Sequence, residues 1–199
     1  EYFEKGRSFL PFLRKLTEKH GILLILDEIV CGFRVALGGA HEYFGVKPDL
    51  AVFAKGIANG MPLSVYCGRA ELIDLSAEIG ISSTYGGEAL SLAAALACAT
   101  YYVEHEVIRG LREKGESLWG RVAALADAKK FPLRLAGHPA CKALLFQTDA
   151  ARVAFFNACY REGVSLYNTS YVNFSHRAED LDEAVEKIDR ALDAAAKEL

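Results

Sequence analysis

Three short segments of the sequence carry residues that can do chemistry. They are 26–34 (LDEIVCGFR), 53–56 (FAKG) and 83–87 (STYGG). Taken singly, each has an ordinary interpretation: an aspartate after a hydrophobic run often starts a turn, a Lys-Gly pair is often a solvated turn, and the third segment suits a loop. Their chemistry therefore depends on whether the fold brings them to one place.

Asp27 and Lys55 occupy the same kind of position. Asp27 follows the aliphatic run 22–26, and Lys55 follows the run 49–54. Short runs that are apolar on both faces are typical of strands in a parallel sheet covered by helices. Because functional groups of open α/β sheets gather at the carboxyl ends of the strands, we expect both side chains to face one site. Asp27 and Glu28 make a poor acid–base pair, since neighbouring residues of a strand point to opposite faces.

In this order and with this spacing, the three segments resemble the class III aminotransferases, which are pyridoxal-phosphate (PLP) enzymes of fold type I. The tract 39–50 (GAHEYFGVKPDL), which leads up to the lysine, is similar to the family as well. The likeness covers essentially the whole chain and is closest to the branch that includes glutamate-1-semialdehyde 2,1-aminomutase. It implies the C-terminal portion of an aminotransferase, which moves an amino group between an amine donor and a carbonyl acceptor.

The resemblance also implies roles for four residues. Lys55 forms the Schiff base with the PLP aldehyde and, once released, moves the proton between substrate and cofactor. Asp27 pairs with the pyridine nitrogen and keeps it protonated, so that the ring accepts electrons. Ile29, expected on the same side of an extended segment as Asp27, packs on one ring face. Thr84 reaches the cofactor phosphate, usually from the neighbouring subunit, which implies a homodimer with a shared active site.

Two departures from the family pattern bear on the activity. Glu88 stands where class III members commonly have asparagine, so we expect its carboxylate to point away from the phosphate and cap the following helix. Segment 78–83 does not look like the mobile loop of the aminomutase, which favours transfer between two substrates over migration within one. An aminomutase of the glutamate-1-semialdehyde type stays open as an alternative, and so does a truncated, inactive fragment.

The rest of the sequence predicts the elements that position these segments. Helical periodicity and apolar runs predict three helices, over 7–20, 89–103 and 179–199. Two further short apolar runs predict strands over 63–67 and 142–147. Alternation of helices with buried strands indicates an α/β layered domain. We expect the C-terminal half of the mainly parallel-sheet large domain of fold type I at 1–104, and a small α+β domain at 105–199.

The bulk properties limit the remaining function classes. The 199 residues have a formal net charge of -3 and no basic run, so nucleic acid is not an expected partner. The apolar run 89–103 is shorter than the roughly 18 residues of a membrane span, so we expect a buried helix there and no membrane association. Five cysteines without a CxxC pair suggest free thiols in the cytoplasm, and no metal site is expected. The start Glu1-Tyr2-Phe3 suggests a piece of a longer protein.

Overall fold

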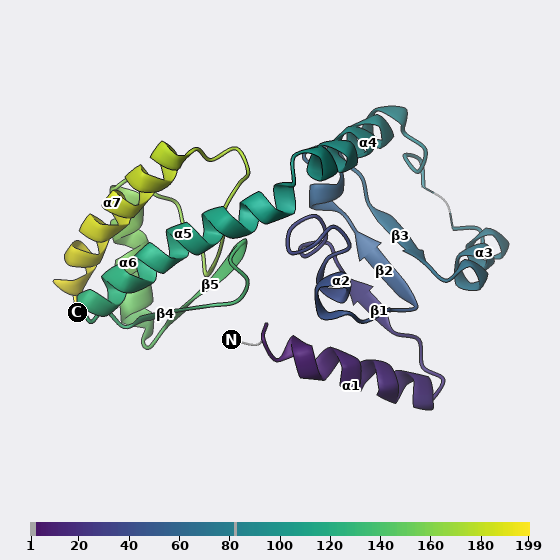
Figure 1. The fold of residues 1–199 in the computed structure, drawn as a ribbon, viewed down its shortest axis with the longest axis horizontal. Coiled ribbons are helices and arrows are strands. Elements are labelled where there is room, and N and C mark those ends of the chain that lie inside the picture. The colour runs from purple at the N-terminus through teal and green to yellow at the C-terminus, as the bar shows by residue number, and fades with distance from the viewer. Residues whose placement is uncertain (1–2, 82) are drawn as a thin grey trace. The chain divides into compact units, whose positions relative to one another are not determined.

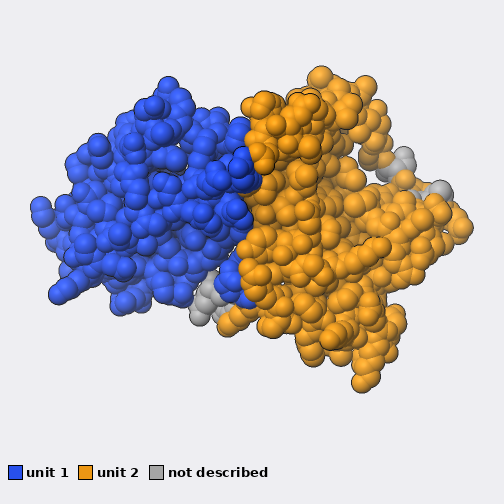
Figure 2. Space-filling model, in the orientation of Figure 1, with its two compact units in different colours: residues 1–4, 109–199 blue, residues 5–108 orange. Residues whose placement is uncertain are grey.

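The computed structural model describes residues 3–81 and 83–199. The chain forms two compact units, residues 5–108 and residues 1–4 with 109–199 (Figure 2). We call them the strand-end unit and the C-terminal unit, because the first holds the strand ends that carry Asp27 and Lys55. The assignment of 1–104 and 105–199 to a large PLP domain and a small domain stays a prediction.

The sheet of the strand-end unit has three strands in the order β1-β2-β3, over Ile25–Asp27, Leu50–Phe53 and Val65–Gly68 (Figure 1). The first two strands are parallel, with Asp27 opposite Val52, whereas β3 runs antiparallel to β2. The third apolar run therefore does not extend the parallel arrangement. Its connection to β2 holds only the short 3-10 helix η1, Lys55–Ile57, and a parallel return needs a longer crossover.

Four helices accompany this sheet: α1 Gly6–Lys19, α2 Ala40–Phe44, α3 Ala70–Glu78 and α4 Ala89–Glu104. Helix α1 ends as the sequence predicts, because Gly21 takes the left-handed conformation with a φ of 62° just after it. The buried carboxylate of Asp49 ties α1 to the strands. It accepts hydrogen bonds from the Leu24 amide at 2.7 Å and from Arg14 Nη1 at 2.8 Å. These bonds, together with one from Arg69, hold the pKa of Asp49 far below its usual value.

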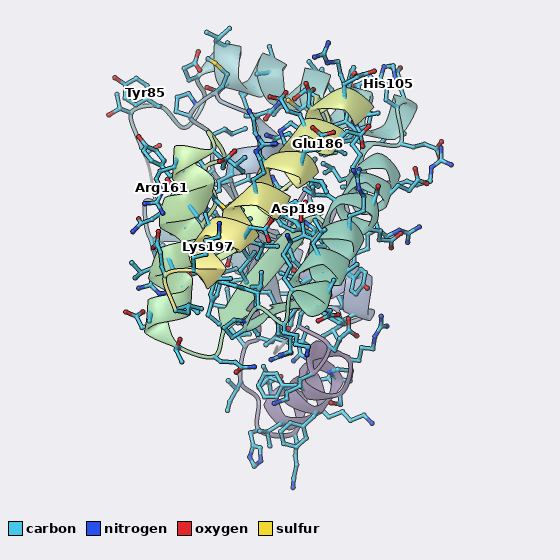
Figure 3. All side chains as sticks on the ribbon, turned by 90° about the vertical axis from the view of Figure 1, so that its left-hand side faces the viewer. Tyr85, His105, Arg161, Glu186, Asp189 and Lys197 are labelled. Atoms are coloured by element: carbon cyan, nitrogen blue, oxygen red, sulfur yellow. The ribbon has the colours of Figure 1, made fainter. Side chains whose placement is uncertain are left out.

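The C-terminal unit is a small α+β arrangement, as the sequence predicts. Its antiparallel sheet has the order β4-β5-β6, over Leu133–Ala136, Cys141–Phe146 and Thr169–Tyr171. Its helices are α5 Val107–Ala128, which begins in the other unit, α6 Asp149–Arg161 and α7 Ala178–Ala196. Helix α7 buries the apolar stripe predicted for it (Leu181, Val185, Ile188 and Leu192), while Glu186 points outward (Figure 3).

Helix α4 is apolar on nearly all sides, yet most of its length is exposed. Its uncovered large side chains are Leu90, Leu92, Leu96, Tyr101 and Val103. In the described parts of the chain, no helix combines the length and the apolarity that crossing a membrane requires. A helix that is hydrophobic all round is normally buried. The expectation of a buried helix at 89–103 was wrong, and the exposure of these side chains needs an explanation.

Candidate active site

The carboxyl ends of β1 and β2 bring Asp27 and Lys55 to one edge of the sheet. Asp27 is the last residue of β1, and Lys55 comes two residues after Phe53, the last residue of β2. The ladder continues past Asp27, because the Glu28 N–H donates to the Val52 carbonyl at 2.8 Å. Neighbouring strands lie about 4.8 Å apart. The two predicted groups thus share one edge.

Asp27 is exposed and has one carboxylate oxygen in use. Its Oδ1 accepts a hydrogen bond from the Ile29 amide at 2.9 Å, and its Oδ2 has no partner among the described residues. This bond from two residues on forms a turn that ends the strand. Ile29 therefore lies in a turn, half-buried, and the expectation of an extended segment through Ile29 was wrong. A contact of Ile29 with the cofactor ring stays a prediction.

Lys55 is exposed and sits on unusual backbone. Its φ of 50° lies in the left-handed region, which non-glycine residues seldom occupy. Non-glycine residues in this conformation cluster at functional sites. The Lys55 carbonyl accepts the Asn59 amide at 3.0 Å, which holds the turn, while its Nζ has no partner among the described residues. The Lys-Gly pair is thus a fixed turn that presents an unpaired amine.

Glycines let the loop after β1 pack closely on the end of β2. A Cβ added to Gly32 would lie 2.5 Å from Phe53 Cδ1, and one added to Gly56 would lie 3.1 Å from Phe33 Cβ. The Phe33 ring meets the Phe53 and Tyr102 rings edge to face, with centroids 6.5 and 5.6 Å apart. The segments that carry Asp27 and Lys55 are therefore packed against each other. The sequence interpretation missed this aromatic layer, although Gly32-Phe33 and Phe53 flank the two groups.

Thr84 lies apart from this strand-end pair. It sits in an exposed turn between α3 and α4, closed by a bond from the Gly86 amide to the Ser83 carbonyl at 3.2 Å. Within the described residues, no hydrogen bond or ring contact joins this turn to Asp27 or Lys55. Tyr85 beside it is 76% exposed and points outward (Figure 3). The structure therefore brings together two of the predicted groups and leaves Thr84 separate.

Glu88 caps α4, as expected from its departure from the family pattern. Its carboxylate accepts the Leu90 and Ser91 amides at 2.7 and 2.8 Å. Hydrogen bonds from Ser91 and from the Leu90 amide lower the pKa of Glu88, so it holds its charge at the positive end of the helix dipole. The carboxylate is thus engaged by its own helix.

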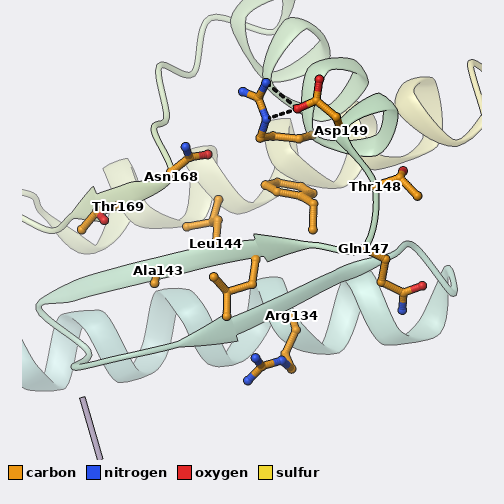
Figure 4. Close-up of a pocket in the computed structure, with 11 residues that line it drawn as sticks. Arg134, Ala143, Leu144, Gln147, Thr148, Asp149, Asn168 and Thr169 are labelled. Carbon is orange, nitrogen blue, oxygen red and sulfur yellow. Dashed lines mark hydrogen bonds and ion pairs between the residues drawn. The ribbon is translucent and has the colours of Figure 1, made fainter. Parts of the chain in front are cut away.

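The C-terminal unit contains a pocket that holds none of the four predicted residues. It has a volume of about 690 Å³ and is lined by parts of β4, β5 and β6 and by the start of α6 (Figure 4). Thr148 caps α6 through the Ala151 amide at 3.2 Å, and Arg152 pairs with Asp149 at 2.7 Å. These polar groups serve the helix, so the strand ends remain the better candidate.

The arrangement at the strand ends suits one kind of cofactor. It offers an amine without a partner and a carboxylate oxygen without a partner, on neighbouring strands of one sheet. An amine fits an aldehyde, and a carboxylate fits a protonated ring nitrogen. PLP carries both groups. The described residues contain no group of three or more His, Cys, Asp or Glu side chains that could hold a metal ion.

Comparison with known families agrees with this geometry. The family model described as aminotransferase class-III matches residues 2–192. The chain belongs to the class III aminotransferases. Enzymes of this family depend on PLP, and the chain carries the corresponding part of fold type I.

Two curated relatives are named glutamate-1-semialdehyde 2,1-aminomutase. A glutamate-1-semialdehyde 2,1-aminomutase of Methanobrevibacter smithii is 31% identical over 98% of this chain and 50% of its own length. One of Syntrophobacter fumaroxidans is 36% identical over 90% of this chain and 46% of its own length. The chain thus spans about half the length of the curated relatives it matches.

Solved structures share the fold. The FumI protein of Sphingopyxis sp. MTA144, solved in its PLP internal aldimine form, superposes with a TM-score of 0.88 at 26% identity over 96% of this chain and 47% of its own. An omega-transaminase of Sphaerobacter thermophilus gives a TM-score of 0.85 at 22% identity, with 96% and 48% of the two chains covered. The fold-class prediction is confirmed by these neighbours.

Proposed function

We propose that the protein to which this chain contributes is a PLP-dependent aminotransferase. It transfers an amino group from an amine donor to a carbonyl acceptor, both small molecules. The observation that carries the proposal is the pairing of Asp27 and Lys55 at the ends of neighbouring parallel strands. Membership in the class III family supports it further.

Each residue has a separate task in this reaction. The bound cofactor supplies an aldehyde and a ring that accepts electrons. Lys55 Nζ would bind the cofactor aldehyde and, once an amine substrate has displaced it, would move a proton from the substrate carbon to the C4′ carbon of the cofactor. Asp27 Oδ2, which has no partner among the described residues, would accept a hydrogen bond from the protonated ring nitrogen. Ile29 packs on one ring face, and Thr84 binds the phosphate.

The same proposal includes a homodimer whose two subunits share each active site. It also places the protein in the cytoplasm. Thr84 has no described link to the strand ends of its own chain, which supports delivery of this side chain to the site of a neighbouring subunit. The exposed apolar face of α4 supports burial against further protein. Residues 1–104 then form part of the PLP-binding domain, and 105–199 form the small domain.

The visible absorbance of the Schiff base tests the proposal. We expect the complete protein to develop this band when incubated with PLP, and we expect Lys55→Ala to abolish it. Lys47→Ala is the matched control, because Lys47 is another exposed lysine of the strand-end unit. An unchanged band in Lys55→Ala contradicts the lysine assignment. A wild-type protein without any band supports the alternative of an inactive fragment.

An aminomutase is the second candidate, because the curated relatives bear that name. It uses the same residues on a single substrate, whereas an aminotransferase releases a keto product from its donor. A screen of amino donors separates the two. Keto product formed in proportion to donor consumed supports the transferase, and conversion of glutamate-1-semialdehyde without a second substrate supports the mutase.

A further inference from the structure

Glu28 is a buried carboxylate directly beside the exposed Asp27. Its side chain is 1% exposed, because adjacent residues at the end of a strand point to opposite sides. Burying a charged group is unfavourable unless hydrogen bonds compensate the lost water. The partners of Glu28 therefore show what it does.

Those partners are the first turn of α2, twelve residues further along the chain. Glu28 Oε2 accepts the Ala40 amide at 2.7 Å, and Oε1 accepts the His41 amide at 2.7 Å. The His41 ring adds a contact from Nδ1 to Oε1 at 3.1 Å. The residue before the helix is Gly39, which has no side chain to cap these amides. A Cβ added to Gly39 would lie 2.2 Å from Oε2, so the carboxylate fills that space instead.

The backbone of Glu28 is held at the same time. Its N–H donates to the Val52 carbonyl of β2 at 2.8 Å, and its carbonyl accepts the Gly32 amide at 2.8 Å. Both ends of the loop 28–40 are thus fastened at one residue. Asp27 precedes that residue, so its position depends on the same bonds.

The contacts continue to the lysine. The His41 ring, held by Glu28, meets the Phe53 ring edge to face with centroids 6.4 Å apart. The Phe53 ring also packs closely on the backbone of Gly32, and Phe53 lies two residues before Lys55 in the sequence. One packed layer therefore runs from Glu28 through His41 and Phe53 to the backbone of Lys55.

We propose that Glu28 is a positioning residue that holds Asp27 and Lys55 in register for the cofactor. It acts through the loop and α2 and touches neither cofactor nor substrate. This inference rests on the proposed function, since the register matters only for a cofactor that bridges both groups.

The decisive variant is Glu28→Gln in the complete protein. A glutamine amide has one accepting oxygen, so one of the two helix amides loses its acceptor and faces an NH₂ group. Loss of one such buried bond corresponds to about a tenfold weaker apparent affinity for PLP, followed as Schiff-base absorbance against PLP concentration. We also expect a shifted pH midpoint of that absorbance and faster hydrogen exchange at the Ala40 and His41 amides in the cofactor-free protein. Wild-type affinity and an unchanged midpoint would overturn the proposal.

Glu42→Gln is the matched control. Glu42 lies in the same segment and its Oε2 accepts the Gly38 amide at 2.6 Å, but it is exposed. We expect affinity within about twofold of wild type, because a solvent-exposed bond is replaced by water. A loss equal to that of Glu28→Gln would mean general loosening of the loop and would also overturn the proposal.

His41→Phe keeps the inference testable if Glu28→Gln does not fold. It retains a ring against Phe53 and removes the contact of the ring nitrogen Nδ1 with Glu28, so we expect about a threefold loss of affinity. No loss in this variant counts against the proposal. A wild-type protein that forms no Schiff base overturns the proposed function itself, whereas a normal wild type with an unaffected Glu28→Gln overturns only the role of Glu28.

Discussion

The two units of the chain differ in how far their large apolar side chains are exposed to solvent. The C-terminal unit leaves few of its described large apolar side chains exposed, and its core includes Leu118, Trp119, Val122, Phe155, Ile188 and Leu192. The strand-end unit buries few and exposes many, among them Phe9, Phe12, Ile22, Leu23, Ile25, Ile79, Leu90, Leu96 and Val103. The proposed chemistry lies in the unit with the smaller core.

The two units therefore differ in how many of their large apolar side chains are left without a packing partner. Many exposed large apolar side chains are typical of faces that pack against further protein. The chain spans about half the length of its curated relatives. The comparison predicts that the two units differ in autonomy, in sensitivity to core mutations and in response to pH.

Separate expression should give the largest effect. We expect residues 109–199 to unfold cooperatively in denaturant, because their own side chains form a core. We expect residues 5–108 alone to show no cooperative transition, because their exposed apolar residues have nothing to pack on. Circular dichroism during urea unfolding measures both. A sharp transition for 5–108 would show that its small core is sufficient.

Truncation of a core residue should give the next largest effect. Phe155 is fully buried and its ring packs on Phe131, Phe146 and Phe156, so Phe155→Ala should lower the free energy of unfolding of 109–199 by about 4 kcal/mol. Tyr160→Ala on the same helix is the control, since its side chain is 77% exposed and we expect a change below about 0.5 kcal/mol. Equal losses would contradict a specifically packed core.

The buried charge of the strand-end unit should respond to pH. Because hydrogen bonds depress the pKa of Asp49 in the folded state, its stabilisation is present above the pKa of an unfolded aspartate and fades as the pH falls below it. Asp49→Asn should lower the free energy of unfolding of the complete protein by about 3 kcal/mol at neutral pH, since Arg14 and Arg69 lose their buried partner.

Thermal unfolding between pH 7 and pH 2 checks this prediction. The difference between wild type and Asp49→Asn should shrink toward acid, because the aspartate of the unfolded chain binds a proton there while hydrogen bonds hold the folded carboxylate ionised. Asp74→Asn serves as the control, since Asp74 is exposed and makes no described ion pair. A constant difference over the whole range would show that the charge of Asp49 is not what stabilises the unit.

Patterns within single elements made much of this molecule predictable. The apolar stripe of α7, the glycine after α1 and the cap by Glu88 each depend on residues close in sequence, and all three were predicted. Asp27 and Lys55 could be paired because strand ends in such sheets converge. The family pattern then supplied roles that their spacing alone does not contain.

The misses share a physical cause, since each depends on contacts between distant residues or on local competition for a hydrogen bond. Ile29 looked extended, but the Asp27 carboxylate captures its amide and turns the chain. The direction of β3 depends on the length of its connection rather than on its composition. Glu28 gave no signal of its bond to Ala40, because a cap supplied from twelve residues away has no local pattern.

A helix cap should give the smallest effect and refine the comparison. Thr148 lies in the C-terminal unit, and its hydroxyl accepts the Ala151 amide at the start of α6. Thr148→Ala leaves that amide without its acceptor and should lower the free energy of unfolding of 109–199 by about 1 kcal/mol, with Thr148→Ser restoring most of it. Chemical denaturation resolves a change of this size. Because α6 already packs on α7 through a buried face, the loss should stay local, and hydrogen exchange should rise only in the first turn of α6. Exchange that rises throughout α6 would mean that the core of the C-terminal unit depends on this cap, and the contrast between the two units would then be smaller than their burial suggests.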